Sequence, residues 1–275
     1  MTPDPEIHDR EERLEREEIN ERTAPSGKIV YEAIFQEGEE ELARNSSALA
    51  WSGFAAGLSM GFSFLAVGLL ERFLPDASWS PLIGALGISL GFLIVVLGRQ
   101  QLFTENTLTV MLPMLRHRDR HTLGNVLRLW LVVLVANVVG ALCFALVLAR
   151  TQVVDTLVYT TLRDAAFQAA SPSFAVAFVR AIFAGWLIAL MVWLLPYAET
   201  ARVAVIVILT YVIGLAHLSH VIVSTVEQGF LLFTGEISVG VFLAHSFVPS
   251  LLGNIVGGVA LVAALNHAQV VSGET

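Results

Sequence analysis

The chain has 275 residues, of which 55% are hydrophobic and 15% charged, and its mean hydropathy is +0.70. This composition is typical of a polytopic helical membrane protein and excludes a soluble globular domain. The net charge of −8 comes from acids crowded into the first 45 residues, the chain has no basic patch that would favour nucleic acid, and its single cysteine excludes an internal disulfide.

The N-terminal segment divides into two parts. Residues 1–27 are highly charged with almost nothing apolar, so we expect a disordered cytoplasmic tail. In residues 28–45, apolar side chains such as Ile29, Ile34 and Leu42 share one helical face, which predicts an amphipathic helix at the membrane surface. No apolar segment comes early enough for a signal peptide, so we expect the first membrane helix to direct insertion.

Residues 46–268 are predicted to form a transmembrane domain of six apolar spans, each near the roughly 20 residues that a bilayer requires. The predicted spans cover about 48–70, 82–115, 123–149, 174–195, 201–232 and 243–265. Arg116, Arg118 and Arg120 lie between the second and third spans. The positive-inside rule therefore predicts that both termini, including the tail 269–275, are cytoplasmic.

The second span has a polar middle. An apolar run from 88 to 98 is followed by Arg99, two glutamines and the segment Thr104-Glu105-Asn106-Thr107, before the chain becomes apolar again up to Leu115. A charge at mid-membrane costs about 2.5–3.5 kcal/mol. Backbone that leaves the helix there is tolerated only inside protein or beside a cavity. We therefore predict a discontinuous helix, with halves ending near Gly98 and beginning near Thr104, and a transport site at the break.

An internal repeat extends this prediction to the fifth span. Span three contains the sequence ANVVGA around Asn137, and span six contains GNIVGG around Asn254, at an offset of 254 − 137 = 117 residues. Three spans separate the copies, so the copies have opposite orientations. Inverted repeats of this kind place a binding site at mid-membrane between two broken helices. The fifth span should accordingly be broken near its residues Gly214, His217 and His220.

The two breaks suggest a site for an anion. Thr104 as the N-cap of a half-helix would leave N–H groups free to bind an anion. We expect His217 to reach the same region from the other repeat and to donate an N–H or share a proton. A bare anion loses hydration beside apolar walls, and pairing with a proton removes most of that barrier. The alternative role for either histidine is a hydrogen bond between helices, which we favour for His220.

The other polar residues of the second span have two open interpretations. Arg99 either neutralises Glu105 across the break or contacts the substrate. Asn106 and Thr107 are expected to satisfy backbone groups that the break leaves unpaired.

Several motifs, in order, resemble the formate/nitrite transporter family over roughly residues 48–266: Ser89-Leu-Gly91, Leu102-Phe103-Thr104, Gly214-Leu-Ala-His217 and the segment 247–258. The resemblance implies an aquaporin-like six-helix protomer, a homopentamer with one path per protomer, and passage of small monovalent anions or their acids, such as formate, nitrite, acetate, lactate or hydrosulfide. It also implies that the family's central histidine falls on His217 and its loop threonine on Thr104.

The chain also departs from the family pattern. The glutamate before the histidine is Ala216, and the asparagine after it is Val221. The aromatic positions of the outer constriction fall on Ile88 and Thr210, and an aliphatic position of the inner one becomes Phe92. These changes indicate an outlying branch. The predicted substrate path comprises Ile88, Phe92, Arg99, Leu102, Phe103, Thr104, Glu105, Asn106, Thr210, His217 and His220.

The sequence therefore predicts a channel or proton-coupled transporter for a small monovalent anion or its conjugate acid in a bacterial inner membrane, in contact with lipids. We expect no cofactor and no metal. Enzymatic activity is not expected, because no nucleophile–base pair or metal-ligand spacing occurs. Two alternatives remain: a neutral-solute or water channel of aquaporin-like shape, and a membrane scaffold or sensor that does not transport.

Overall fold

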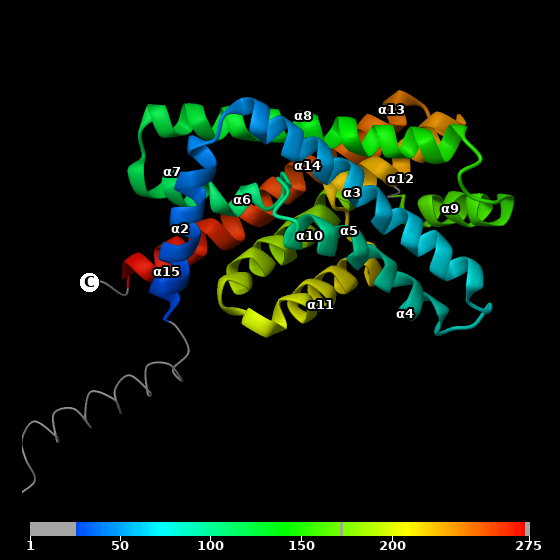
Figure 1. The fold of residues 1–275 in the computed structure, drawn as a ribbon, viewed down its shortest axis with the longest axis horizontal. Helices are drawn as coiled ribbons and strands as arrows, with labels where there is room; N and C mark the ends of the chain where they lie inside the picture. The colour runs from blue at the N-terminus through cyan, green and yellow to red at the C-terminus, as the bar shows by residue number, and fades with distance from the viewer. Residues whose placement is uncertain (1–25, 171–172, 273–275) are drawn as a thin grey trace, which may run out of the picture.

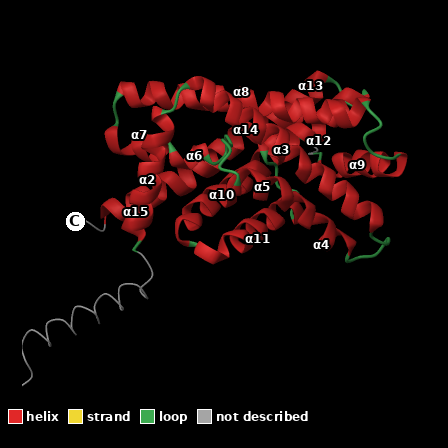
Figure 2. Cartoon of the chain, in the orientation of Figure 1, coloured by secondary structure: helices red, strands yellow, loops and turns green. Residues whose placement is uncertain are grey.

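The computed structural model describes residues 26–170 and 173–272, and this part of the chain consists of helices and loops alone (Figure 2). The fold class is therefore all-α, as predicted. The expected charged tail lies, up to residue 25, outside the described residues.

The helices follow the predicted spans. In chain order they are α2 (Gly27–Ala43), α3 (Ser46–Phe73), α4 (Ser80–Gly84), η1 (Ala85–Gly87), α5 (Ile88–Leu97), α6 (Asn106–Thr109), α7 (Met111–His117), α8 (Arg120–Arg150), α9 (Thr156–Ala169), α10 (Phe174–Leu194), η2 (Leu195–Tyr197), η3 (Glu199–Ala201), α11 (Arg202–Leu215), α12 (Val221–Thr234), α13 (Val239–Val241), η4 (Phe242–Phe247), α14 (Val248–Ile255), η5 (Val256–Ala263) and α15 (Ala264–Ser272).

Five helical runs within the described residues are long and apolar enough to cross a membrane: Ser46–Phe73, Ser80–Leu97, Arg120–Arg150, Phe174–Tyr197 and Val239–Gln269. Two shorter helices, α11 and α12, follow one another in the region of the predicted fifth span, and α12 is apolar. Both expected interruptions are present, because α5 is separated from α6 and α11 from α12 by chain that is not helical.

Short polar residues begin several of these helices. The side chain of Asn45 accepts the N–H of Ala48 at 2.8 Å at the start of α3. The Asp119 carboxylate accepts two backbone N–H groups at the start of α8, and Asp155 does the same for α9. Such caps satisfy donors that have no partner inside the helix, so the sequence itself sets these boundaries.

Glycines allow the long helices to approach one another closely. A side chain at Gly57 of α3 would collide with the backbone oxygen of Asn137 in α8, and one at Gly257 of η5 with that of Ile182 in α10. Small residues at helix contacts are the usual means of close packing in membranes. The same means is used in both halves of the chain.

Figure 1 shows α8 running along one side of the molecule, with α2 crossing one end and α9 lying at the opposite end. The outer surfaces of α3 and α8 keep large apolar side chains exposed, including Trp51, Leu127 and Leu131. Such surfaces suit contact with lipid or with a neighbouring protomer.

One feature differs from the sequence-based expectation. The amphipathic helix α9, of 14 residues, was not expected and is too short to count as a span. Val158, Leu162 and Ala166 form part of its buried face. The last helix, α15, continues to Ser272.

Candidate transport site

The first half-helix of each broken span ends in the same way. Arg99 and His217 both have left-handed backbone, with φ of 53° and 47°. The next residue, Gln100 or Leu218, donates its N–H to the carbonyl five positions back, at 3.0 and 2.9 Å. This is the Schellman ending, in which glycine usually occupies the left-handed position. The two endings are separated by 217 − 99 = 118 residues, so the internal repeat is a repeat of backbone geometry.

An asparagine holds the first break open. Asn137 of α8 accepts the backbone N–H of Phe103 at 2.9 Å through Oδ1. Its Nδ2 donates to the carbonyls of Gly53 and Gln101, at 2.7 and 2.9 Å. Asn137 is completely buried. One side chain thus satisfies two backbone groups that the interrupted helix leaves unpaired, and it ties them to α3.

Asn254 holds the second break in the same manner. Its Oδ1 accepts the N–H of Val221 at 2.8 Å, and its Nδ2 donates to the carbonyls of Ala181 and Ser219, at 2.8 and 3.0 Å. Sequence analysis found these asparagines as a repeat but assigned them no role.

The clamps make Leu102 and His220 equivalent positions. Each lies between a residue whose carbonyl accepts from the asparagine and a residue whose N–H donates to it. The backbone is thus duplicated, whereas the side chain at this position is alkyl in one half and imidazole in the other.

The two breaks meet at a buried hydrogen bond between Thr104 and His220. Thr104 Oγ1 lies 2.7 Å from His220 Nε2. His220 also caps α12, because its Nδ1 accepts the N–H of Val223 at 3.4 Å. The Phe92 ring meets the imidazole edge-on, with ring centroids 5.0 Å apart. The exposed fractions of Thr104, His220 and Phe92 are 0%, 1% and 0%.

This geometry corrects the expectation that His217 would meet Thr104. His217 occupies the left-handed turn itself, and its side chain lines a cavity on the far side of the break. The chain between α11 and α12 is not helical, so helical spacing could not indicate which of the two histidines turns inward. Thr104 is not an N-cap either, because α6 begins at Asn106.

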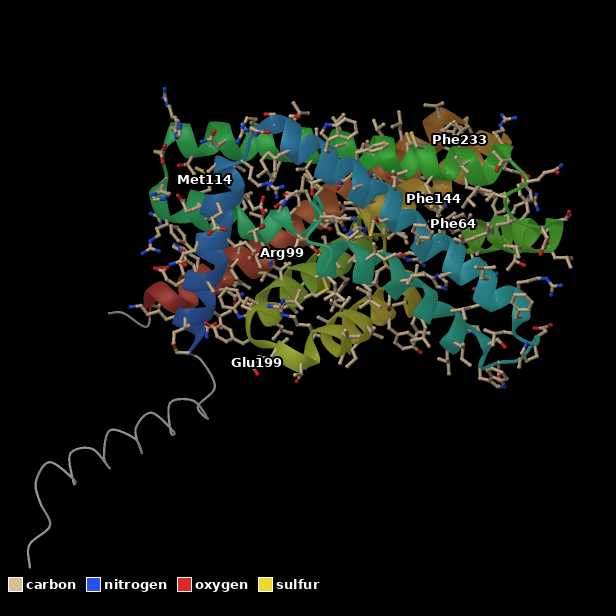
Figure 3. All side chains as sticks on the ribbon, in the orientation of Figure 1. Phe64, Arg99, Met114, Phe144, Glu199 and Phe233 are labelled. Carbon is tan, nitrogen blue, oxygen red and sulfur yellow. The ribbon has the colours of Figure 1, made fainter. Side chains whose placement is uncertain are left out.

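Arg99 does not pair with Glu105. Its guanidinium lies 3.1 Å from a carboxylate oxygen of Glu37 on α2. The Arg99 side chain is 72% exposed, and Figure 3 shows it beside the end of α5. The reason is the left-handed backbone at Arg99, which ends α5 and leaves the side chain outside the protein interior rather than across the break.

Asn106 is held in place by hydrogen bonds of its side chain and of its backbone. Its amide donates to Gln101 Oε1 at 3.0 Å, and its backbone oxygen accepts the indole N–H of Trp130 at 3.1 Å. Thr107 donates its hydroxyl to the carbonyl of Thr104 at 2.7 Å. Thr107 thus satisfies a backbone group of the break, as expected, whereas the Asn106 side chain pairs with the Gln101 side chain rather than with backbone.

Phe103 and Thr210 lie away from the central pair. The Phe103 ring packs against Trp130 of α8, with centroids 5.7 Å apart. The Thr210 hydroxyl bonds to Ser89 Oγ at 2.9 Å and to a carbonyl of its own helix. Neither residue lines the cavities described next.

Two cavities approach the central pair, one beside each break. The proximal vestibule, of about 450 Å³, is lined by α2, the first break and the start of α11; Leu102 and Glu105 belong to it. The distal vestibule, of about 470 Å³, is lined by α3, α4, α9, α11 and α12; Ile88, His217 and Ser219 belong to it.

The two vestibules share no lining residue, and Thr104, His220 and Phe92 line neither of them. Residues next to the pair in the sequence line both cavities: Glu105 lines the proximal vestibule and Ser219 lines the distal one. The pair therefore lies outside both cavities, at the point where the two breaks meet.

Acidic side chains are prominent in both vestibules. The proximal one contains Glu37, Glu40, Glu41 and Glu105 together with Arg99 and Arg202; the distal one contains Glu71, Asp76, Asp164 and Glu227 without a lysine or arginine in its lining. Burial raises the pKa of the Glu37 carboxyl above 4.5, and Arg99 opposes that rise. Sequence analysis did not foresee that α2 would contribute carboxylates to a cavity, because nothing in the pattern of α2 shows what it covers.

Comparison with known proteins adds independent findings. A family model described as "Formate/nitrite transporter" matches residues 28–268. The chain is 38% identical over 260 residues to the inner membrane protein YfdC of Escherichia coli (strain K12), covering 94% of this chain and 84% of YfdC. It is 26% identical over 242 residues to the formate channel BtFdhC of Bacillus thuringiensis, covering 85% and 91%.

Two solved structures share the fold. An FNT family ion channel superimposes with a TM-score of 0.74 at 19% identity, covering 86% of this chain and 97% of that one. A pentameric formate channel with formate bound superimposes with a TM-score of 0.67 at 20% identity, covering 86% and 98%.

Proposed function

Because the chain belongs to the formate/nitrite transporter family and is therefore a membrane transport protein rather than an enzyme, we propose that it carries a small monovalent anion or its conjugate acid past Thr104 and His220. The observation that carries this proposal is the buried hydrogen bond between these residues, located where the two broken helices meet between two vestibules. The residue in the central role is His220 rather than His217.

The hydrogen bonds of His220 define what the pair offers to a solute. Since Nδ1 accepts the N–H of Val223, the neutral imidazole carries its hydrogen on Nε2 and donates it to Thr104 Oγ1. The hydroxyl hydrogen of Thr104 has no other acceptor among the described residues, so it can be donated to an oxygen of a passing carboxylate, nitrite or acid.

The surroundings of the pair favour a neutral solute at the narrowest point. Phe92 covers the imidazole, and both are removed from solvent. An isolated ion in such surroundings loses its hydration without full compensation, whereas its neutral acid does not. Proton coupling is thus part of the proposal.

Transport by purified protein in liposomes tests the proposal. We expect Thr104→Val and His220→Ala to reduce formate, nitrite and acetate flux at least tenfold, which corresponds to about 1.4 kcal/mol at the barrier. His217→Ala is the matched control and should stay within about twofold of the parent, since its side chain reaches only the vestibule. Parent-like flux in both central variants between pH 5 and pH 8 would overturn the proposal.

The same vesicles separate the alternatives. Osmotic swelling with no movement of anions or acids would favour a neutral-solute or water channel. Absence of all flux would favour a scaffold or sensor.

We also propose that α2 lies at the cytoplasmic face of a bacterial inner membrane and that the protein is a homopentamer. Arg116 at the end of α7 pairs with Glu32 of α2, and Arg118 and Arg120 follow directly, which supports this orientation by the positive-inside rule. The assembly is suggested by the pentameric formate channel that shares the fold. Labelling of single cysteines in α2 from either side of the membrane tests the orientation, and labelling from the periplasmic side would contradict it.

A further inference from the structure

One oxygen of a carboxyl group next to the central threonine is buried without a hydrogen-bond partner. Glu105 follows Thr104 directly in the first break, and its Oε1 atom has no hydrogen-bond partner among the described residues. Its side chain lines the proximal vestibule. A polar atom that is removed from solvent and left unpaired costs free energy, so its retention at this position requires an explanation.

Charged groups around Glu105 do not provide that partner. Glu37 and Glu41 of α2 act on it with like charge, and Arg99 with opposite charge. The Arg99 guanidinium is bound to Glu37 at 3.1 Å. Glu40 and Arg202 complete the charged lining of the same vestibule. An ionised carboxylate oxygen that lacks a hydrogen-bond partner in such a setting is costly to keep.

We propose that Glu105 is the group that passes a proton to a weak-acid anion in the proximal vestibule, an inference that rests on the proposed function. The carboxyl O–H of Glu105 hydrogen-bonds to an oxygen of the arriving anion and transfers its proton. Glu105 becomes a carboxylate and the solute becomes the neutral acid. The neutral acid passes Thr104 and His220, and the carboxylate recovers a proton from water in the vestibule.

Glu105 suits this step better than its neighbours do. His220 is enclosed and lines neither vestibule, so it cannot exchange protons with solvent in the closed state. Gln100 and Gln101 line the vestibule but carry no exchangeable acid proton. Glu40 is exposed and lies on α2 rather than in the break beside Thr104.

Glu105→Gln is the direct test, because it keeps the shape and a hydrogen-bond donor but cannot release a proton. In liposomes, we expect the formate uptake rate of this variant to fall about tenfold at pH 8, where bulk protons are scarce, and to stay within about twofold of the parent at pH 5. Glu105→Asp should restore part of the pH 8 rate. Glu40→Gln, in the same vestibule, is the matched control and should follow the parent at both pH values.

Two outcomes would overturn the inference. If Glu105→Gln lowers the rate equally at both pH values, the residue only supports the break. If it changes neither rate, the residue takes no part in transport. A parent protein that moves no weak acid at all would instead overturn the proposed function itself.

Infrared difference spectroscopy supplies a readout that does not depend on flux. The parent at neutral pH should show a protonated carboxyl C=O band that loses intensity when formate is added, and Glu105→Gln should lack it. A parent spectrum identical to that of the variant would contradict a protonated Glu105.

Discussion

At the scale of single residues, the two asparagine clamps account for the stability of the breaks. Asn137 and Asn254 each form three hydrogen bonds to backbone groups, two of which belong to the break and would otherwise be unpaired in the protein interior. The geometry is the same in both halves, so the energetic role should be the same.

We predict that Asn137→Ala and Asn254→Ala destabilise the protein to similar extents, by at least about 2 kcal/mol, because each orphaned buried group costs about 1–3 kcal/mol. Unfolding in mixed detergent micelles measures the effect. Asn125→Ala in α8 is the control, since that side chain lies at the surface beside the α7–α8 turn rather than at a break. A neutral effect at either clamp would show that the break is held by other contacts.

The residue scale is also where prediction from sequence was weakest. Thr104 was identified correctly as a residue of the first break, but its partner was assigned to His217. The two histidines are three positions apart, and both follow a glycine-containing apolar run. Which one turns inward depends on the left-handed turn at His217 and on the clamp that fixes Ser219 and Val221. Neither the left-handed turn nor the clamp can be recognised from the neighbouring residues in the sequence.

At the scale of helices, close packing between α3 and α8 depends on Gly57. The backbone oxygen of Asn137 lies where a side chain at Gly57 would have to go. The contact matters for the site because Asn137 is also the clamp of the first break.

We predict that Gly57→Ala destabilises the protein by about 1–3 kcal/mol through overpacking. Gly124→Ala in α8 should instead stabilise the protein by about 0.5–1 kcal/mol, because open space surrounds Gly124 and alanine favours the helix. Thermal unfolding of both variants in one detergent makes the comparison. Equal effects would contradict a packing role for Gly57.

The helix α2 is attached by polar contacts: Arg99 to Glu37, Arg116 to Glu32 and His117 to Glu39, at 3.1, 2.7 and 3.0 Å. Burial raises the pKa of Glu37 above its ordinary 4.5, so docked α2 binds this proton more tightly than undocked α2. Protonated Glu37 therefore contributes its full stabilisation of docked α2 below pH 4.5. This stabilisation is lost as the pH rises through the raised pKa of Glu37.

We predict that exchange of α2 amides, corrected for the intrinsic effect of pH, becomes faster as pH rises from 4.5 to 7 in the parent. Glu37→Gln should flatten this dependence, and Glu40→Gln on the exposed side of α2 should keep most of it, because the like charge of Glu40 raises the Glu37 pKa less than burial does. Identical slopes in all three proteins would exclude Glu37 as the group responsible.

At the scale of the whole molecule, the sequence was sufficient for the architecture. The apolar spans follow from length and hydropathy, and the broken second and fifth spans follow from polar residues at mid-span and from the repeat of Asn137 and Asn254. The helix α9 could not be predicted in the same way, because it is too short for a span and its apolar face packs on the protein itself at one end of the molecule.

We predict that the detergent-solubilised protein is a pentamer, with five times the protomer mass of 29.8 kDa. The exposed apolar side chains of α3 and α8, such as Trp51 and Leu131, give the protomer surface that could be shared with neighbours. Native mass spectrometry measures the assembly. A stable monomer or dimer at every detergent concentration would contradict the prediction.

The equivalence of Leu102 and His220 bears on the direction of transport. A backbone that repeats itself with inverted orientation offers the same route whether it is entered from one side of the bilayer or the other. Any rectification, meaning unequal rates for equal and opposite gradients, must then originate in side chains that differ between the halves. Leucine at 102 and histidine at 220 form one such difference, next to the two clamps, and we predict that exchanging them changes the ratio of the two rates.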